Sequence, residues 1–424
     1  MELNQNYNNE EKQERIILAG VHTGAADPLS DTTDESMEEL EELVKTAGGL
    51  AVCTLVQNRP SPEPGTYLGE GKLEELKNAV QALEADAVVF DDELSPVQTR
   101  NVSDYLGIKV LDRSTLILDI FAMRAKTGEG KLQVELAQLK YRLPRLRGMG
   151  AEMSRTGGGI GTRGPGETRL ETDRRYIRSR ISALEGEIRE LKKHRELIRS
   201  RRKKDGVITA AIVGYTNAGK STLLNTLTDA DILAENKLFA TLDPTSRGFT
   251  LEDNRRILLV DTVGFIRKLP HHLIDAFKST LEEAVVADLL IHVIDSASPH
   301  YEEQIRVVES VLSDIGAWGK PIVGVYNKCD LAEEIYPRTD YRENVIISAK
   351  KRINLDGLIR ALGDAAPGKK RRVRVLIPYD RGTLVSEIHR DQKVLSEEYT
   401  GEGTEMELLA GEEMYRKLKE FVIE

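Results

Sequence analysis

Cysteine, tryptophan and long apolar runs are scarce in this sequence, and each scarcity excludes a class of protein. Only Cys53 and Cys329 occur among 424 residues. Two cysteines cannot build a disulfide scaffold or, alone, a zinc site, and they fit a reducing cytosol. No apolar run approaches the roughly 18 residues of a membrane span. The N-terminal residues are polar, so we expect no secretory signal and a cytoplasmic protein. Aromatic residues make up 5%, with Trp318 as the one tryptophan, which disfavours a broad base-stacking surface.

The chain is too long for one domain of the usual 50–250 or so residues, so we expect several. At its beginning, apolar runs alternate with amphipathic stretches, which predicts a parallel α/β domain over residues 1–130. The strands expected there are 15–21, 50–56, 87–90 and 108–111. Between the last two, Ser95, Pro96 and Gln98 form a helix start with a capping box, and Gly107 marks the end of that helix.

Two heptad patterns follow. The first consists of Leu132, Leu136, Leu139, Leu143 and Leu146, and the second of Ile177, Ile181, Leu184, Ile188, Leu191 and Ile198. Pro144 predicts that the first helix ends near Leu143, and the second helix is expected at about 168–204. Because residues 156–166 include six glycines, we predict an antiparallel helical hairpin over 131–205 with a glycine-rich tip loop.

This hairpin is basic although the chain is acidic. Residues 140–205 hold twenty Lys and Arg against nine Asp and Glu, whereas the whole chain has a net charge of -10. A local basic block is typical of a surface that binds a polyanion such as nucleic acid. The alternative is an ordinary helical linker packed on its own protein. We favour a projecting arm, because basic residues cluster toward the tip: Arg142, Arg145, Arg147, Arg155, Arg163 and Arg169.

Residues 206–367 form a second alternating α/β segment, which begins with a phosphate-binding loop. A strand runs into Gly214-Tyr-Thr-Asn-Ala-Gly-Lys-Ser221, and an apolar helix follows. This is the strand–loop–helix context that the G-x-x-x-x-G-K-S motif needs. Backbone amides of such a loop close around phosphate oxygens at a helix N-terminus. We predict that Lys220 reaches the β- and γ-phosphates and that the Ser221 hydroxyl binds Mg²⁺.

Three further motifs follow at the carboxyl ends of expected strands. In Asp261-Thr-Val-Gly264, the carboxylate can hold Mg²⁺ through water and the glycine N–H can meet the γ-phosphate. In Asn327-Lys-Cys-Asp330, the Asp330 carboxylate can pair with the N1–H and the amine of guanine, whereas adenine lacks that donor pair. Ser348-Ala-Lys350 would support the base through backbone amides. This order predicts a doubly wound P-loop GTPase domain.

The segment Phe239-Ala-Thr-Leu-Asp-Pro-Thr245 occupies the position of the first switch loop. Spacing does not distinguish Thr241 from Thr245 as a Mg²⁺ ligand. The residues predicted to bind the nucleotide are Gly214, Tyr215, Thr216, Asn217, Ala218, Gly219, Lys220, Ser221, Phe239, Ala240, Thr241, Leu242, Asp243, Asp261, Thr262, Val263, Gly264, Asn327, Lys328, Cys329, Asp330, Ser348, Ala349 and Lys350.

The candidate catalytic residues are Lys220, Thr241, Gly264 and Asn217, and few other protein groups are available. Small GTPases place a water-positioning Gln after Asp-x-x-Gly, but here that residue is Phe265. We therefore expect slow intrinsic hydrolysis and help from a partner. We hypothesise that the Asn217 carbonyl oxygen helps hold K⁺ near the β,γ-bridge; the alternative is that Asn217 only braces the loop.

Other features carry no predicted chemistry. Gly65-Thr-Tyr-Leu-Gly-Glu-Gly-Lys72 resembles a phosphate loop, but its spacing is one residue too long and Leu73 follows the lysine. The pair His271-His272 with His292 nearby is more typical of structure than of a metal site. Residues 371–424 predict a small α+β domain in which Val373, Val375 and Ile377 share one strand face and the last helix ends near Val422.

Taken together, these motifs resemble the HflX family of ribosome-associated GTPases. The matching stretches are Gly214–Ser221, Phe239–Thr245, Asp261–Phe265, the tip Gly157–Thr168, and Gly69–Lys72. The resemblance covers almost the whole chain and implies that Thr241 binds Mg²⁺ beside Ser221 and Asp261, the last through water. It also implies binding to the large (50S) ribosomal subunit and its rRNA, with the hairpin directed at the peptidyl transferase region, and splitting or recycling of ribosomes, often under stress.

Two other functions stay open at this point. A signalling GTPase would recruit a protein effector through the helical arm, and that binding would survive nuclease and depend little on salt. An RNA-remodelling enzyme would use residues 1–130 as a separate motor, and its ATP hydrolysis would survive Asp330→Asn. We expect a monomer without an integral membrane segment.

Overall fold

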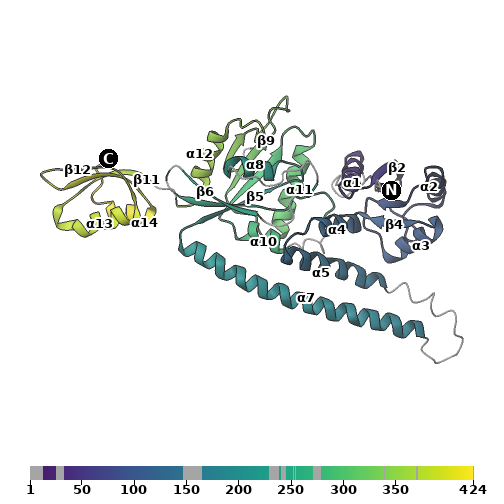
Figure 1. Ribbon diagram of the computed structural model, residues 1–424. Helices are drawn as coiled ribbons and strands as arrows, with labels where there is room; N and C mark the ends of the chain where they lie inside the picture. The colour runs from purple at the N-terminus through teal and green to yellow at the C-terminus, as the bar shows by residue number, and fades with distance from the viewer. Residues whose placement is uncertain are drawn as a thin grey trace, which may run out of the picture. The chain divides into compact units, whose positions relative to one another are not determined.

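The computed structural model describes residues 13–24, 33–146, 165–228, 238–239, 245–251, 253, 255–270, 278–338, 340–368 and 371–423. Its elements are shown in Figure 1. The chain forms two compact units. The first contains Met1–His194 with Glu235–Asp243 and Phe265–Ser279, and the second contains Arg195–Ala234, Pro244–Gly264 and Thr280–Glu424. Among the described residues, no helix combines the length and apolarity that crossing a membrane would require.

The first unit contains a four-stranded parallel sheet in the order β2-β1-β3-β4. Its strands are β1 (Arg15–His22), β2 (Leu50–Asn58), β3 (Ala87–Phe90) and β4 (Lys109–Asp112). They alternate with α1 (Asp34–Thr46), α2 (Glu70–Ala82), α3 (Pro96–Leu106) and α4 (Arg113–Arg124). Strand β1 is buried along nearly its whole length, as expected for a parallel strand covered on both faces. The predicted N-terminal parallel α/β fold is confirmed.

Helix α3 begins and ends as its sequence predicts. The Ser95 side chain accepts from the Gln98 amide while the Gln98 side chain accepts from the Ser95 amide, and Pro96 occupies the first helical position. Gly107 caps the C-terminus with φ 71°, a left-handed conformation that glycine adopts without strain. These local signals fix the helix because their partners lie within four residues of one another.

Helices α5 (Gly128–Arg145) and α7 (Pro165–Lys204) form the hairpin. Up to His194, α7 runs in the opposite direction to α5 (Figure 1), and Arg180 bonds to Glu135 at 2.7 and 2.8 Å. The helix was predicted to end near Leu143, and it ends two residues later at Arg145, with Pro144 inside its last turn. A proline there removes only one hydrogen bond, and the Leu146 amide still bonds to the Arg142 carbonyl.

The second heptad seam is only partly buried. Leu184 is fully buried, whereas Ile198 is 37% exposed. Helix α7 has 40 residues and α5 has 18, so α5 can cover only part of α7. Most of the glycine-rich tip and Arg147, Arg155 and Arg163 lie outside the described residues.

The second unit contains a six-stranded sheet in the order β10-β9-β8-β5-β7-β6. The strands are β5 (Ile208–Gly214), β6 (Thr245–Thr250), β7 (Arg256–Asp261), β8 (Leu289–Asp295), β9 (Ile322–Asn327) and β10 (Glu343–Ile346). The helices are α8 (Lys220–Thr228), α10 (Lys278–Val286), α11 (Tyr301–Asp314) and α12 (Leu355–Ala365). The predicted P-loop fold is confirmed, but β6 pairs antiparallel with β7 at the edge, a strand that the sequence did not predict.

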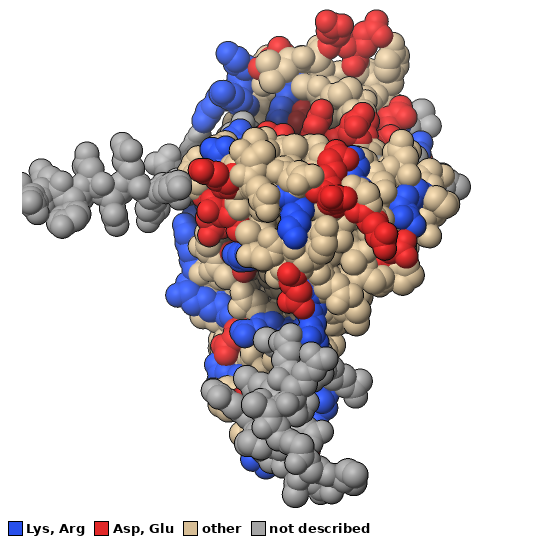
Figure 2. Space-filling view, turned by 90° about the vertical axis from the view of Figure 1, so that its right-hand side faces the viewer, with Lys and Arg blue, Asp and Glu red and all other residues tan. Residues whose placement is uncertain are grey.

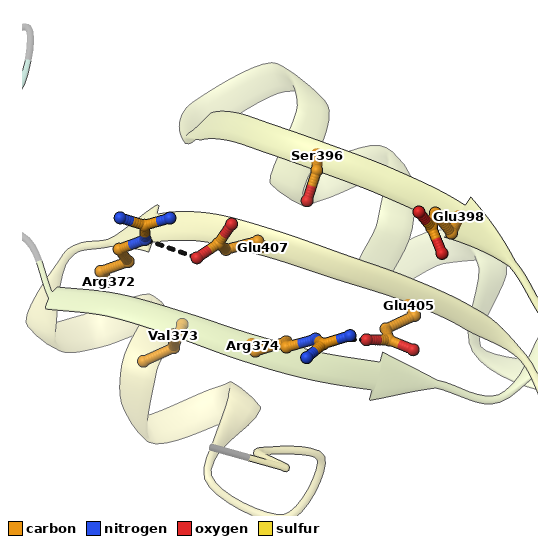
Figure 3. Close-up of a pocket in the computed structure, with 7 residues that line it drawn as sticks. All are labelled: Arg372, Val373, Arg374, Ser396, Glu398, Glu405 and Glu407. Carbon is orange, nitrogen blue, oxygen red and sulfur yellow. Dashed lines mark hydrogen bonds and ion pairs between the residues drawn. The ribbon is translucent and has the colours of Figure 1, made fainter.

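A separate antiparallel sheet follows in the order β11-β13-β12. It consists of β11 (Arg371–Ile377), β12 (Lys393–Tyr399) and β13 (Thr404–Ala410), with α13 (Gly382–Asp391) and α14 (Glu412–Leu418). Val373, Val375 and Ile377 are buried as predicted, but the last helix ends at Leu418. The opposite face is a charged hollow of about 410 Å³, in which Arg372 pairs with Glu407 and Arg374 with Glu405 (Figure 3).

Candidate nucleotide-binding site

The phosphate-binding loop lies between central strand β5 and helix α8, as predicted. Lys220 begins α8, is buried, and donates hydrogen bonds to the carbonyls of Gly214 at 3.2 Å and Tyr215 at 2.8 Å. Burial lowers the pKa of Lys220 to about 8, against the opposing charge of Asp261. The lysine is thus held over the loop, where phosphate oxygens would complete its hydrogen bonds.

Asn327 joins this loop to the two base-binding motifs. Its side-chain amide donates to the Ala218 carbonyl at 2.9 Å, and its oxygen accepts from the Ala349 amide at 2.9 Å. Gly219 makes room for it, since a Cβ there would lie 2.3 Å from Asn327 Nδ2. The structure therefore places the buried Asn327 side chain as a brace between backbone segments.

The residues expected to hold Mg²⁺ are adjacent. Ser221 Oγ donates to Asp261 Oδ2 at 2.7 Å, which brings together the hydroxyl and the carboxylate that such a site needs. Next to them, the Thr262 hydroxyl donates to the Ile212 carbonyl at 2.7 Å and ties the Asp-x-x-Gly segment to β5. These side chains fit the ion. Thr241, its third expected ligand, lies outside the described residues, as do Ala240, Leu242 and Asp243.

The base-binding end of the site includes a solvent-exposed carboxylate. Asp330 is exposed, and a hydrogen bond from Ser348 lowers the pKa of its carboxyl group. An ionised carboxylate is the form that can accept two donors from guanine. Ala349 is buried and Lys350 is exposed, while the Cys329 amide donates to the Ile347 carbonyl at 3.1 Å.

Two residues that were not predicted from the sequence, Asp295 and Ser296, support the base-binding end of the site. The carboxylate of Asp295 accepts from Lys328 Nζ at 2.6 Å, and the Ser296 hydroxyl donates to the Asn327 carbonyl at 2.5 Å. Lys328 itself has φ 64°. The sequence could have predicted their position, because Asp295 ends the apolar strand β8 and Ser296 follows it. The carboxyl end of this strand lies at the same sheet edge as the other motifs.

Phe265, which follows Gly264, and Phe239 of the first switch loop belong to the first unit. Phe239 is buried edge-on against Phe121, with ring centroids 4.7 Å apart. Phe265 is 1% exposed. Lys268 Nζ lies 2.5 Å from Asp91 Oδ2 and 2.6 Å from Asp92 Oδ1. Neither aromatic side chain can orient a water molecule.

Asp91 is the centre of a buried polar network in the first unit. Besides Lys268, it accepts from Ser36 Oγ at 2.6 Å and from Arg113 Nη1 at 2.7 Å. Burial alone would raise the pKa of Asp91, but the charges of Arg113 and Lys268 hold it below its usual value. No sequence motif marked these residues, since their partners are distant in the chain.

A second hollow lies in the first unit, with a volume of about 380 Å³. It is lined by Val21, Thr23, Pro62, Tyr67, Asp92, Glu93 and Gln98. The two carboxylates disfavour a phosphate group there. In the adjoining sequence that resembles a phosphate loop, the Gly69 amide already donates to Gln57 at 2.9 Å.

The histidines do not assemble a metal site within the part of the chain that the structure describes. No group of three or more His, Cys, Asp or Glu side chains has a suitable arrangement there. His292 is buried with Nδ1 2.9 Å from the Tyr341 hydroxyl, and burial lowers its pKa to about 3. His271 and His272 lie outside the described residues.

Three family models match successive parts of the chain. Residues 34–122 match the model described as GTP-binding GTPase N-terminal, and residues 124–202 match GTP-binding GTPase Middle Region. Residues 209–328 match 50S ribosome-binding GTPase. The last of these includes the phosphate-binding loop, the Asp261 motif and Asn327.

Curated relatives cover nearly the whole chain. GTPase HflX of Caldanaerobacter subterraneus is 51% identical over 97% of this chain and 94% of its own. GTPase HflX of Escherichia coli is 45% identical over 86% of this chain and 88% of its own. The solved structure of SsGBP in complex with GDP is 30% identical, with 84% of this chain and 98% of that one covered at a TM-score of 0.46.

Proposed function

Because the chain belongs to the HflX family of GTPases, we propose that it hydrolyses GTP to GDP and phosphate and uses this cycle to act on the large ribosomal subunit. The observation that supports the chemistry is the brace formed by Asn327. It joins the phosphate-binding loop at Ala218 to the base-binding loop at Ala349, so both ends of one nucleotide can be held at once.

The geometry supports roles for Lys220, Ser221 and Asp261, and the family resemblance implies the role of Thr241. Lys220 would bind the β- and γ-phosphates. Ser221 and Thr241 would hold Mg²⁺, with Asp261 acting through water. The ion would neutralise charge on the β- and γ-phosphate oxygens. Gly264 offers its amide to the γ-phosphate. Phe265 supplies no water-orienting group, so we propose that the partner accelerates hydrolysis.

Guanine selection is proposed to rest on Asp330. Its exposed carboxylate accepts from N1–H and the exocyclic amine of guanine, and xanthine carries a carbonyl in place of that amine. The variant Asp330→Asn replaces one acceptor by a donor, so it should lose GTP and gain affinity for xanthosine triphosphate. A variant that kept its GTP affinity would refute this assignment, and ATP hydrolysis surviving in it would favour a separate motor in the first unit.

The ribosomal target is proposed from charge and family together. Residues 140–205 hold twenty Lys and Arg against nine Asp and Glu, and Figure 2 shows Lys and Arg side chains along the left edge and in the lower part of the face in view. The tip sequence adds glycines, which let a chain approach the RNA backbone closely. A model described as 50S ribosome-binding GTPase matches residues 209–328. We propose that GTP orders the switch loops, that this state binds the large subunit, and that it splits or recycles ribosomes, including under stress.

The test is GTP hydrolysis in K⁺ buffer with purified large subunits, with small subunits as the matched control. We expect strong stimulation by the large subunit alone. Subunit separation is then followed by light scattering with GTP and with a non-hydrolysable analogue. Absence of stimulation, with nucleotide binding intact, would shift the proposal to a signalling GTPase whose arm recruits a protein effector.

A further inference from the structure

One polar group of the phosphate-binding loop is left over by the roles given above. Thr216 is buried, with 6% of its surface exposed, and its hydroxyl oxygen is shielded from solvent. Among the described residues that hydroxyl has no hydrogen-bond partner. A buried hydroxyl without a hydrogen bond destabilises the fold. In a binding site, an atom of the bound ligand can supply the missing hydrogen-bond partner.

The position of Thr216 indicates which part of the ligand that is. A Cβ placed on Gly264 would lie 2.8 Å from Thr216 Cγ2, 2.9 Å from Thr216 Cα and 2.9 Å from Lys220 Nζ. Thr216, Gly264 and the lysine amine therefore converge on one small region. The last two are the groups expected to meet the γ-phosphate.

The residue that usually acts near this phosphate is absent from the chain. Phe265 occupies the place of the water-orienting Gln, and the next residue, Ile266, is also apolar and buried. Thr216 belongs to the loop between β5 and α8. It can offer a hydroxyl donor, which neither Phe265 nor Ile266 carries.

We propose that the Thr216 hydroxyl donates a hydrogen bond to a γ-phosphate oxygen of GTP. It is then a catalytic residue that favours the triphosphate over GDP and supports hydrolysis. This inference rests on the phosphate-loop assignment proposed above. The competing explanation is that Thr216 only fills space against Gly264 through its methyl group.

Two variants separate these explanations, because each keeps one half of the side chain. Thr216→Val keeps the branched shape and removes the hydroxyl, whereas Thr216→Ser keeps the hydroxyl and removes the methyl group. Affinities for GDP and for a non-hydrolysable GTP analogue are measured by fluorescence titration. Single-turnover GTP hydrolysis is measured on the same samples.

We expect Thr216→Val to weaken the GTP analogue at least about tenfold (~1.4 kcal/mol) relative to GDP, and to slow hydrolysis at least as much. Thr216→Ser should stay within about threefold of the unmodified chain in both measurements. If valine is tolerated and serine is not, Thr216 is a packing residue and the proposal is wrong. Equal losses of GDP and analogue in Thr216→Val would also overturn it, because GDP has no γ-phosphate.

Lys220→Ala distinguishes failure of this inference from failure of the site itself. That variant should lose affinity for both GDP and the analogue, since it removes the charge that faces the β-phosphate. Unchanged affinity in Lys220→Ala would mean that the loop is not the phosphate site. Normal loss in Lys220→Ala together with an unaffected Thr216→Val would reject only the role of Thr216.

Discussion

At the scale of single residues, Lys220 couples nucleotide binding to pH. Burial lowers its pKa to about 8, and phosphate oxygens favour the charged amine, so binding should raise that pKa. At about pH 8.5, binding should then take up protons, and GDP affinity should fall as the pH rises further. Calorimetry in two buffers of different ionisation enthalpy measures the uptake. Lys220→Arg stays charged and is the control, and equal uptake by both chains would contradict the assignment.

Asn217 is the other single residue whose role can be tested directly. It is exposed and has φ 61°, a left-handed conformation that is uncommon outside glycine. The exposed side chain is accessible to an ion, which the hypothesised K⁺ contact requires. We expect faster hydrolysis in KCl than in NaCl at matched ionic strength, and loss of that difference in Asn217→Ala. Equal hydrolysis rates in the two salts would contradict the K⁺ contact and favour the alternative, in which Asn217 only braces the phosphate loop.

At the scale of elements, His292 on β8 makes the second unit sensitive to acid. Its pKa is lowered to about 3 by burial first and by the charges of Lys220 and Arg338 second. In the unfolded chain the pKa of a histidine is about 6.5. Below that pH, His292 is therefore protonated in the unfolded state and stays neutral in the folded state. Stability should therefore fall by about 1.4 kcal/mol per pH unit from about pH 6.5 toward 3.

The measurement is urea unfolding followed by Trp318 fluorescence, since the one tryptophan of the chain lies in the second unit. His292→Asn retains a donor toward Tyr341 but does not titrate. Between about pH 6.5 and 5, the unmodified chain should lose about 2 kcal/mol more than this variant. Parallel pH profiles for the two chains would show that His292 is not the responsible group.

The elements also show why part of the structure could be predicted from sequence. The capping box at Ser95 and the phosphate loop are local, because their partners lie within a few residues. Strand β6 was missed because its antiparallel pairing depends on β7. Asn327 was predicted to bind the nucleotide, and the structure adds that its side chain joins Ala218 and Ala349. That role depends on two loops 131 residues apart in the chain, and a local sequence pattern cannot predict a contact between such distant segments.

At the scale of the whole molecule, the charge distribution predicts how the chain meets RNA. A block of net charge +11 lies within a chain of net charge -10, so long-range attraction to a polyanion must come from the arm while the remainder is repelled. Each cation that contacts a phosphate releases about one counterion, so the logarithm of affinity falls linearly with the logarithm of salt concentration. The slope of that line counts the contacts.

Replacing Arg163 and Arg169 by Ala should weaken binding to the large ribosomal subunit and reduce the salt slope by about two, because each arginine accounts for about one phosphate contact. The matched control is Lys192→Ala with Lys193→Ala, which removes the same charge from α7 far from the tip. Co-sedimentation at several salt concentrations measures both pairs, with GDP affinity as a check on the nucleotide site. If the control pair changes the slope as much as the tip pair does, the arm attracts RNA by its total charge, and the tip makes no specific contacts.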